Sequence, residues 1–371
     1  MLMDWKIADP FLQENKFRFQ KSNKFQEEQM FEGFLSTPGA IGSTAVEAKD
    51  GAVIFMYSAS GGKIFKKSFD SGRTFCDEWT SPFGETTANS NLLRLKDGRL
   101  MMTLRNKPTN IEIWKFGGSD FTVVFSDDDG KTWSKERSVN KNSGCYYLMN
   151  SRLLRLKSGR ILIPICFVPD EFVSGDHFEN VGYSGCFYSD DEGQNWSEGK
   201  WMKAESAGGM LAEPIVVEAD NGKVIMYMRT TRGYLYSGVS IDGGETFCTE
   251  QPTELRSANA PFTIAKDQYS GKFFAVWDNT FPSVIHQSPR SPICMAASDD
   301  GIRWDFIMEL DNNPDHNYGY PALYFTEDEI IVTYYFNETK KFNKEINQLK
   351  LKIFNRDELT VRKYIEVPLF K

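Results

Sequence analysis

The sequence has few of the residues that usually hold metal ions. Among its 371 residues are only 3 histidines, and its 6 cysteines lie far apart, with no Cys-x-x-Cys pair. Structural zinc sites normally use closely spaced cysteines and histidines, so we expect no metal site and no cofactor. A chain of this length also needs no disulfide framework, and most of the cysteines are expected to be small buried apolar residues.

Long apolar runs and basic clusters are missing as well. No stretch of eighteen apolar residues occurs, and the first ten residues, MLMDWKIADP, contain no apolar core of a signal peptide. The formal net charge is −8 and the pI about 5.2, and no block of lysine and arginine could neutralise phosphates. We therefore expect a soluble protein with no membrane segment and no nucleic-acid partner. Its compartment (cytoplasm or export) and its oligomeric state stay open.

Aromatic residues, in contrast, are abundant. They make up 14% of the chain, with 29 Phe, 15 Tyr and 8 Trp, and hydrophobic residues as a whole make up 40%. This is enough for a large buried core, and aromatic side chains favour strands over helices. No helical periodicity of useful length, no linker and no composition shift interrupts the chain. We expect an all-β protein whose residues 1–371 form a single domain.

One short motif recurs along the chain. Its full copies are SFDSGRTF (68–75), SDDDGKTW (126–133), SDDEGQNW (189–196) and SIDGGETF (240–247), and a shorter copy is SDDGIRW (298–304). Serine and aspartate side chains bind nearby backbone N–H groups, and glycine supplies the positive φ of a tight hairpin. The final aromatic residue fills the space beneath the turn. The motif is therefore a structural turn, and its aspartates are not candidates for catalysis.

A second repeat alternates with the first. Its copies begin with GSTAVEAKDG (42–51), NSNLLRLKDG (89–98), NSRLLRLKSG (150–159), EPIVVEADNG (213–222), PFTIAK (261–266) and YPALYF (320–325). Each copy is an apolar strand and a turn, followed by a second apolar strand. Six units of roughly 60 residues predict a six-bladed β-propeller, in which residues 1–35 supply an outer strand and close the ring.

In a propeller the first strand of each blade lines the central channel, and the residues at its start surround a pocket at one end. Aligning the six repeats places mostly polar side chains at that position. They are Gly42, Asn89, Asn150, Glu213, Asn259 or Ala260, and Tyr320. A ring with no function would carry small or apolar residues, so the alignment predicts a polar binding pocket.

The order of four residues in the second half of the chain resembles the sialidase superfamily. Glu213 begins one blade, Arg229 follows 16 residues later, Arg290 precedes the fifth turn motif, and Tyr320 begins the last blade. The turn motifs themselves resemble the Asp boxes of that family. The resemblance implies a sialidase-like propeller that acts on a glycan or a small acidic sugar.

The resemblance also implies a role for each of these residues. Guanidinium groups bind carboxylates with two parallel hydrogen bonds, so Arg229 and Arg290 would hold the carboxylate of a sugar acid. Tyr320 would be the nucleophile, because a neutral phenol avoids repulsion from that carboxylate, and Glu213 would take its proton. The expected reaction is hydrolysis of a terminal acidic sugar with retention of configuration.

Two elements of the family pattern are missing, and both belong to the first blade. Residues 40–44 (AIGST) lack the third arginine of the carboxylate clamp, and residues 58–68 (SASGGKIFKKS) lack the acid/base aspartate. Arg105 and Arg152, on or beside inner strands, are candidates for the arginine. The candidates for the acid are Asp176 and His177 in the long loop 169–182, Asp278, and Asp315 or His316 just before Tyr320; His316 is also a candidate for substrate binding.

Three other interpretations stay open at this point. Another exo-glycosidase, for example one directed at arabinan, would show a pair of carboxylates in the pocket. A polysaccharide lyase would use Tyr and His without a second carboxylate, and a carbohydrate-binding propeller would have a pocket but no turnover. At the level of residues, Glu213 and Arg229 could also form a salt bridge that holds two blades together, and Tyr320 could be a core residue.

Overall fold

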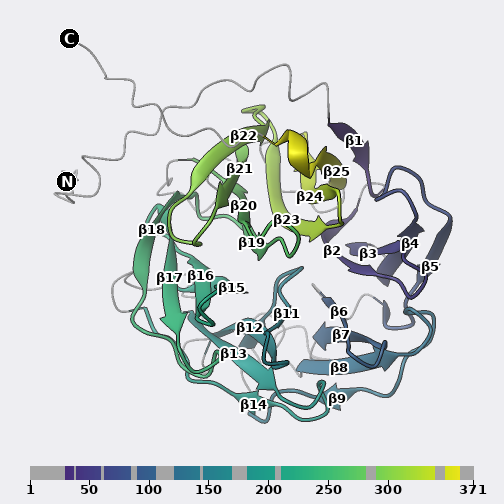
Figure 1. The fold of residues 1–371 in the computed structure, drawn as a ribbon, viewed down its shortest axis with the longest axis horizontal. Coiled ribbons are helices and arrows are strands. Elements are labelled where there is room, and N and C mark those ends of the chain that lie inside the picture. Colours follow the sequence, from purple (N-terminus) through teal and green to yellow (C-terminus); the bar gives the residue numbers. More distant parts are fainter. Residues whose placement is uncertain are drawn as a thin grey trace.

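The computed structural model describes residues 30–36, 39–59, 62–84, 90–105, 121–142, 145–168, 182–204, 210–280, 290–338 and 347–359. Within these residues six antiparallel sheets stand in a ring, in chain order (Figure 1). The only described helix is a short 3₁₀ turn, η4 (Arg356–Glu358). The predicted all-β six-bladed propeller is confirmed.

The strands of each blade follow one another from the ring axis outward. Blade 1 has β2 (Ile41–Glu47), β3 (Val53–Ala59), β4 (Gly62–Ser68) and β5 (Asp77–Thr80); blade 2 has β6 (Leu92–Arg94), β7 (Leu100–Arg105), β8 (Phe121–Ser126) and β9 (Arg137–Ser138). Blade 3 has β10 (Cys145–Tyr147) and β11 (Leu154–Arg155), which both pair with β12 (Ile161–Val168), then β13 (Tyr183–Ser189) and β14 (Ser197–Glu198).

The second half of the ring follows the same order. Blade 4 has β15 (Ala212–Glu218), β16 (Val224–Arg229), β17 (Tyr234–Ser240) and β18 (Gln251–Arg256); blade 5 has β19 (Thr263–Lys266), β20 (Phe273–Asp278), β21 (Ile293–Ser298) and β22 (Asp305–Asp311). Blade 6 has β23 (Asn317–Phe325), β24 (Glu329–Asn337), β25 (Gln348–Asn355) and, as its outermost strand, β1 (Phe31–Phe34). Pairing of β1 with β25 joins a segment from before the first blade to the last blade.

The core lies between neighbouring blades. Each large cluster of buried apolar side chains joins two adjacent blades, and one of them joins blade 6 to blade 1. The second strand of each blade is covered on both faces, so its sequence is a continuous apolar run, as in FFAVWD of β20. Burial between blades therefore holds the inner strands, and the side chains at their ends, in fixed positions.

The recurring turns between third and fourth strands share one hydrogen-bond pattern. In the first, the Ser68 hydroxyl accepts from the Gly72 N–H at 2.7 Å, and an Asp70 oxygen accepts from the Thr74 N–H at 2.8 Å. Burial alone would raise the pKa of Asp70, but hydrogen bonds from Thr74 and Ser68 lower it to about 2. The aspartate is fully used within its own turn, as a structural role requires.

Candidate functional site

Three inner strands are bulged near their first residues. The pairing register shifts in β2, β15 and β23, and the bulged residues with left-handed backbone are Gly42 (φ 60°), Glu213 (φ 49°) and Tyr320 (φ 47°). This conformation costs about 1–3 kcal/mol for a residue other than glycine, and it is concentrated at binding and catalytic sites. A bulge also turns its side chain away from the regular alternation of the strand. We call this end of the ring the site end.

Glu213 and Arg229 form a nearly buried ion pair at the site end. The Arg229 Nη1 donates to Glu213 Oε1 at 2.8 Å. The side chain of Arg229 is 12% exposed and that of Glu213 is 9% exposed. Arg229 Nε also donates to Asn259 Oδ1 at 2.6 Å, which connects blade 4 to the start of blade 5. The second oxygen of Glu213 is buried and has no hydrogen-bond partner among the described residues. That oxygen can still accept a proton or a hydrogen bond.

Tyr320 lies within electrostatic range of this pair. Burial raises the pKa of its phenol, and the Glu213 carboxylate raises it further, while Arg290, Arg229 and Arg152 act in the opposite direction. The phenol is therefore neutral at physiological pH. A neutral phenol beside a carboxylate with an open oxygen is an arrangement in which the carboxylate can take the phenolic proton.

Arg290 approaches Tyr320 from the segment before β21. Its Nη1 donates to the Tyr335 hydroxyl at 2.8 Å, and its backbone carbonyl accepts from the Tyr318 N–H at 3.0 Å. Burial alone would lower the pKa of the Arg290 guanidinium, but Tyr335, Tyr320 and Asp278 outweigh burial and raise it. Arg290 is a fixed cation of the site end.

Arg152 comes from blade 3 and is almost fully buried, with 2% of its surface exposed. Its Nη2 donates to the Phe262 carbonyl at 2.6 Å, whereas Nε and Nη1 have no partner among the described residues. Burial lowers the pKa of Arg152 to about 10, although Glu213 and Tyr320 act to raise it. The side chain stays cationic at neutral pH, with two donors unused.

Asp278, the last residue of β20, is the second carboxyl of this neighbourhood. It is completely buried, and neither carboxyl oxygen has a hydrogen-bond partner among the described residues. Burial raises its pKa well above the usual value, although Arg290 and Arg229 act to lower it. Burial therefore favours the neutral form of this carboxyl group.

Asn150 and Gly42 explain why the described start of the first strand of blade 1 carries no side chain toward the site end. The Asn150 Nδ2 donates to the backbone carbonyls of Ser43 and Tyr320, at 3.0 and 3.2 Å, so its amide ties blade 3 to blades 1 and 6. A Cβ on Gly42 would lie 3.2 Å from the Asn150 side chain. The space that a first-blade arginine would need is occupied by Asn150.

The other residues predicted for the site make different contacts or lie outside the described residues. Arg105, at the end of β7, stacks on the Tyr147 ring with its Cζ 4.4 Å from the ring centroid. His316 packs against Phe336 and is 3.1 Å from the Asn313 amide through Nε2, and Asp315 is exposed on the turn before β23. Asn89, Asp176 and His177 belong to segments outside the described residues.

Three contributors to the site were not identified from the sequence. Tyr335 has the pattern of an apolar core strand, and only its hydrogen bond with Arg290 distinguishes it from a core residue. Asn91, two positions after the predicted Asn89, accepts a hydrogen bond from the Arg152 backbone N–H. Phe262 acts through its carbonyl, which no sequence pattern could indicate.

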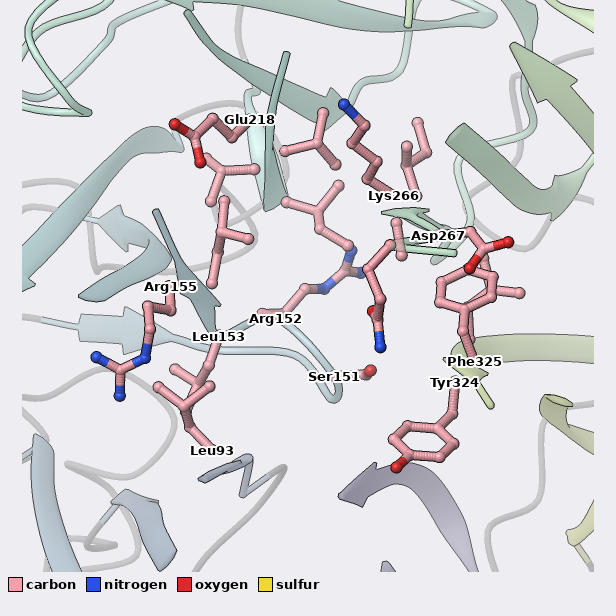
Figure 2. Close-up of a pocket in the computed structure, with 18 of the residues that line it drawn as sticks. Leu93, Ser151, Arg152, Leu153, Arg155, Glu218, Lys266, Asp267, Tyr324 and Phe325 are labelled. Carbon is pink, nitrogen blue, oxygen red and sulfur yellow. The ribbon is translucent and has the colours of Figure 1, made fainter. Parts of the chain in front are cut away.

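A cavity lies elsewhere, along the later parts of the inner strands and the turns that follow them. It has a volume of about 700 Å³, and in the described part of the chain its lining includes Arg152 but neither Glu213 nor Tyr320. Figure 2 shows Arg152 near the middle of this cavity, with Arg155 and Glu218 at its edge. We call this opposite end of the ring the turn end.

Ionic groups of the turn end are paired with other protein groups. The ion pairs are Arg94–Asp129 at 2.6 Å, Arg155–Glu192 at 2.5 Å, Lys157–Asp220 at 3.3 Å, Lys266–Asp220 at 2.6 Å and Arg356–Asp267 at 2.6 Å. The size of this cavity is therefore not a reason to place the chemistry there. Unpartnered carboxyl oxygens of Glu213 and Asp278 lie at the site end. Arg152, whose Nε and Nη1 have no partner among the described residues, lines this cavity and is also in electrostatic range of Glu213 and Tyr320.

Two further searches of the described residues give negative results. They contain no group of three or more His, Cys, Asp or Glu side chains that could hold a metal ion. Within the same residues, no helix has the length and apolar character needed to cross a bilayer.

Comparison with known proteins agrees with this architecture. Residues 71–332, more than half of the chain, match the family model of the BNR repeat-like domain. A sialidase of Bacteroides fragilis is 25% identical over 246 residues, which cover 63% of this chain and 42% of the relative. A sialidase of Paraclostridium sordellii is 22% identical over 328 residues, which cover 79% and 78% of the two chains. This chain thus spans less than half the length of the Bacteroides relative.

Solved structures extend the comparison to the fold. A mutant Trypanosoma rangeli sialidase with trans-sialidase activity superimposes with a TM-score of 0.68 at 14% identity, over 89% of this chain and 59% of that chain. An α-L-arabinanase of Penicillium chrysogenum, solved with arabinobiose, gives 0.61 at 13% identity, over 89% and 99%. These identities establish the fold alone. With the family match, the chain belongs to the BNR repeat-like family within the sialidase superfamily.

Proposed function

We propose that this chain is an exo-acting glycoside hydrolase that releases a terminal acidic sugar, such as a sialic acid, from glycans with retention of configuration. One observation carries the proposal: blades 3 to 6 gather three guanidinium groups, a carboxylate and a neutral phenol at one end of the ring. The open hydrogen-bonding positions of Glu213 and Arg152 support a ligand that completes them. The distant sialidase relatives support the same class of substrate.

In the proposed binding mode the arginines hold the carboxylate of the sugar. Arg229 and Arg290 are fixed by Asn259 and Tyr335, which leaves their remaining N–H groups to the ligand. Arg152 contributes Nε and Nη1 and takes the place of the missing first-blade arginine. Each charge-assisted hydrogen bond contributes about 1.5–3 kcal/mol. Three cations against one nearby carboxylate would favour an anionic sugar over a neutral one.

The proposed reaction has two steps. The Tyr320 oxygen attacks the anomeric carbon as Glu213 takes the phenolic proton, and the glycosidic C–O bond breaks with its electron pair on the leaving oxygen. Water then attacks the anomeric carbon of the glycosyl-tyrosine and gives one proton to the group that protonated the leaving oxygen in the first step, while Tyr320 leaves with a proton returned by Glu213. The leaving oxygen of the first step needs a proton, and Asp176 stays our candidate to supply it. Asp315 is a weaker candidate, because its backbone N–H is held by the Asn313 side chain in an exposed turn.

A panel of aryl glycosides tests the proposal. It would contain the α-sialoside together with uronic, arabinosyl and rhamnosyl versions that carry the same aryl group. We expect release from the sialoside or another acidic sugar and none from the neutral ones. An aryl leaving group needs little protonation, so activity would be detected even if the enzyme's general acid were inefficient. Release from the arabinoside alone would overturn the proposal in favour of an arabinan-directed enzyme, and silence with tight sugar binding would favour a binding protein.

A further inference from the structure

Asp278 is a buried carboxyl group that the proposed reaction does not use. It ends β20 next to Arg290, because Asp278 pairs with Ile293 at the start of β21 and the following N–H, of Asn279, donates to the Pro292 carbonyl at 3.0 Å. Its own carbonyl accepts from Ala258, the residue before the Asn259 that holds Arg229. The backbone thus places Asp278 between two segments: the one that contains Arg290 and the one that contains Asn259, which binds Arg229.

The side chain is at a position that other blades use for a cation. The second strand ends with Arg105 in blade 2 and with Arg229 in blade 4, whereas in blade 5 it ends with Asp278. An ionised carboxylate there would be expected to pair with a guanidinium group, but neither of its oxygens has a hydrogen-bond partner among the described residues. A buried carboxyl group without partners is tolerated mainly when it is protonated.

Every ionisable group near Asp278 bears on its charge. Arg229 of β16 and Arg290 before β21 favour the ionised form, but less strongly than burial opposes it. The other ionisable neighbours are Cys294 of β21, Tyr318 of β23 and Tyr335 of β24, whose own pKa values are all raised, by burial first. These three groups are neutral near pH 7, so Asp278 is the described acid of this cluster whose charge depends on the balance between burial and the two arginines.

We propose that Asp278 is a specificity-determining residue: its protonated form leaves the positive charge of Arg229 and Arg290 to the carboxylate of an acidic sugar, and its ionised form competes with that carboxylate. The inference rests on the proposed function of the same site. Two carboxylates close to the same pair of guanidinium groups repel each other, so a bound sugar acid favours the proton on Asp278. Binding of an acidic sugar is therefore coupled to one proton.

Calorimetric titration of the full chain between pH 5 and 8 tests the coupling. The probe is the methyl α-glycoside of N-acetylneuraminic acid, and the neutral control is its carboxyl methyl ester. Above the pKa of Asp278, we expect the Kd of the acid to rise about tenfold per pH unit, as uptake of one proton requires, and the Kd of the ester to stay level. Buffers of different ionisation enthalpy should report uptake of close to one proton in that range.

Asp278→Asn should remove the coupling without removing binding. We expect the variant to keep the Kd that the wild type has at low pH, level up to pH 8, because the amide cannot ionise. Asp267→Asn is the matched control: Asp267 is equally buried, but it pairs with Arg356 at the turn end, and its loss should leave the pH dependence of binding unchanged. The buffer experiment on the wild type needs no variant, so it stays decisive if Asp278→Asn folds poorly.

The outcomes separate this inference from the proposed function. Binding of the acid with no proton uptake, or an Asp278→Asn variant that keeps the wild-type pH dependence, would overturn the coupling and leave the proposed function intact. Equal pH dependence for the acid and its ester would do the same. Failure of the wild type to bind the acid at any pH would overturn both.

Discussion

The two ends of the ring are built from the same inner strands, yet they treat charge in opposite ways. At the turn end, Lys157 and Lys266 share the exposed Asp220, at 3.3 and 2.6 Å, and Arg155 pairs with Glu192 at 2.5 Å. At the site end, one oxygen of Glu213 and both carboxyl oxygens of Asp278 have no hydrogen-bond partner among the described residues. The cavity of about 700 Å³ belongs to the first end.

This difference indicates which end of the ring serves only the stability of the fold and which end is suited to bind a ligand. Exposed ion pairs contribute about 0–1 kcal/mol each and fit a surface that needs only to stay soluble. A buried polar atom without a partner costs about 1–3 kcal/mol, and more when it is charged, so a fold keeps several together only where something else compensates for them. A bound ligand is the simplest compensation, which is why we place the function at the site end. Substitutions of matched residues at the two ends test this comparison.

The largest effect should come from the phenol of Tyr320. Tyr320→Phe removes the proposed nucleophile and should lower kcat for an acidic aryl glycoside by on the order of 10⁴-fold, with sugar affinity nearly unchanged. Tyr324→Phe, in a residue that lines the turn-end cavity, is the control and should keep wild-type turnover. Steady-state kinetics and calorimetry on the same preparations give both numbers. Wild-type turnover in Tyr320→Phe would remove Tyr320 from the mechanism.

Two arginines of blade 3, Arg152 and Arg155, offer the next comparison. Arg152→Met should weaken binding of an acidic sugar by roughly 10–100-fold, because charge-assisted hydrogen bonds are lost, while thermal stability stays level or rises as a buried cation disappears. Arg155→Met breaks the ion pair with Glu192 at the turn end and should lower stability by at most about 1 kcal/mol, with no change in affinity. Calorimetric Kd values and melting curves test both. Equal losses of affinity in the two variants would contradict the assignment of Arg152.

Repeats in the sequence were sufficient to predict the blades but not the exact direction of each side chain. Asn150 and Glu213 begin equivalent repeats, yet Glu213 joins the site whereas Asn150 binds backbone carbonyls of blades 1 and 6. The cause is local register: β15 has a single bulge, whereas residues 148–153 interrupt the inner strand of blade 3. One extra residue reverses the face of a strand, and a repeat alignment does not specify it.

Residues that act at the ends of second strands were harder still to find from the sequence. Tyr335 belongs to an unbroken apolar run, so nothing in its surroundings distinguishes a hydroxyl that positions Arg290 from a packed ring. Asp278 was one of several acids that could have filled the gap left by blade 1. Its burial beside two arginines depends on how blades 4, 5 and 6 meet, which is a long-range property.

A smaller effect should distinguish two glycines of blade 1. Gly42 and Gly51 both have positive φ, at 60° and 83°, but an added Cβ would meet Asn150 at 3.2 Å from Gly42 and nothing within 4 Å from Gly51. Gly51→Ala should therefore cost about 1 kcal/mol of backbone strain, and Gly42→Ala about 2–3 kcal/mol because Asn150 must also move. Denaturant unfolding gives both values. Equal losses would mean that Asn150 does not limit the space at blade 1.

The smallest effect concerns the stability of the ligand-free chain and carries a defined sign. The pKa of Asp278 is raised in the folded state by burial, against the opposing arginines, so between the unfolded pKa of about 3.9 and the folded pKa the native chain holds the extra proton. Stability then falls with rising pH across that window and levels off above the folded pKa. Asp278→Asn lacks this dependence. Its stability should match the wild type near pH 4 and exceed it by about 1–2 kcal/mol at neutral pH, in urea unfolding at both pH values. If the difference in unfolding free energy between Asp278→Asn and the wild type is the same at both pH values, the carboxyl group is ionised at both. The site end would then carry one more negative charge than we infer.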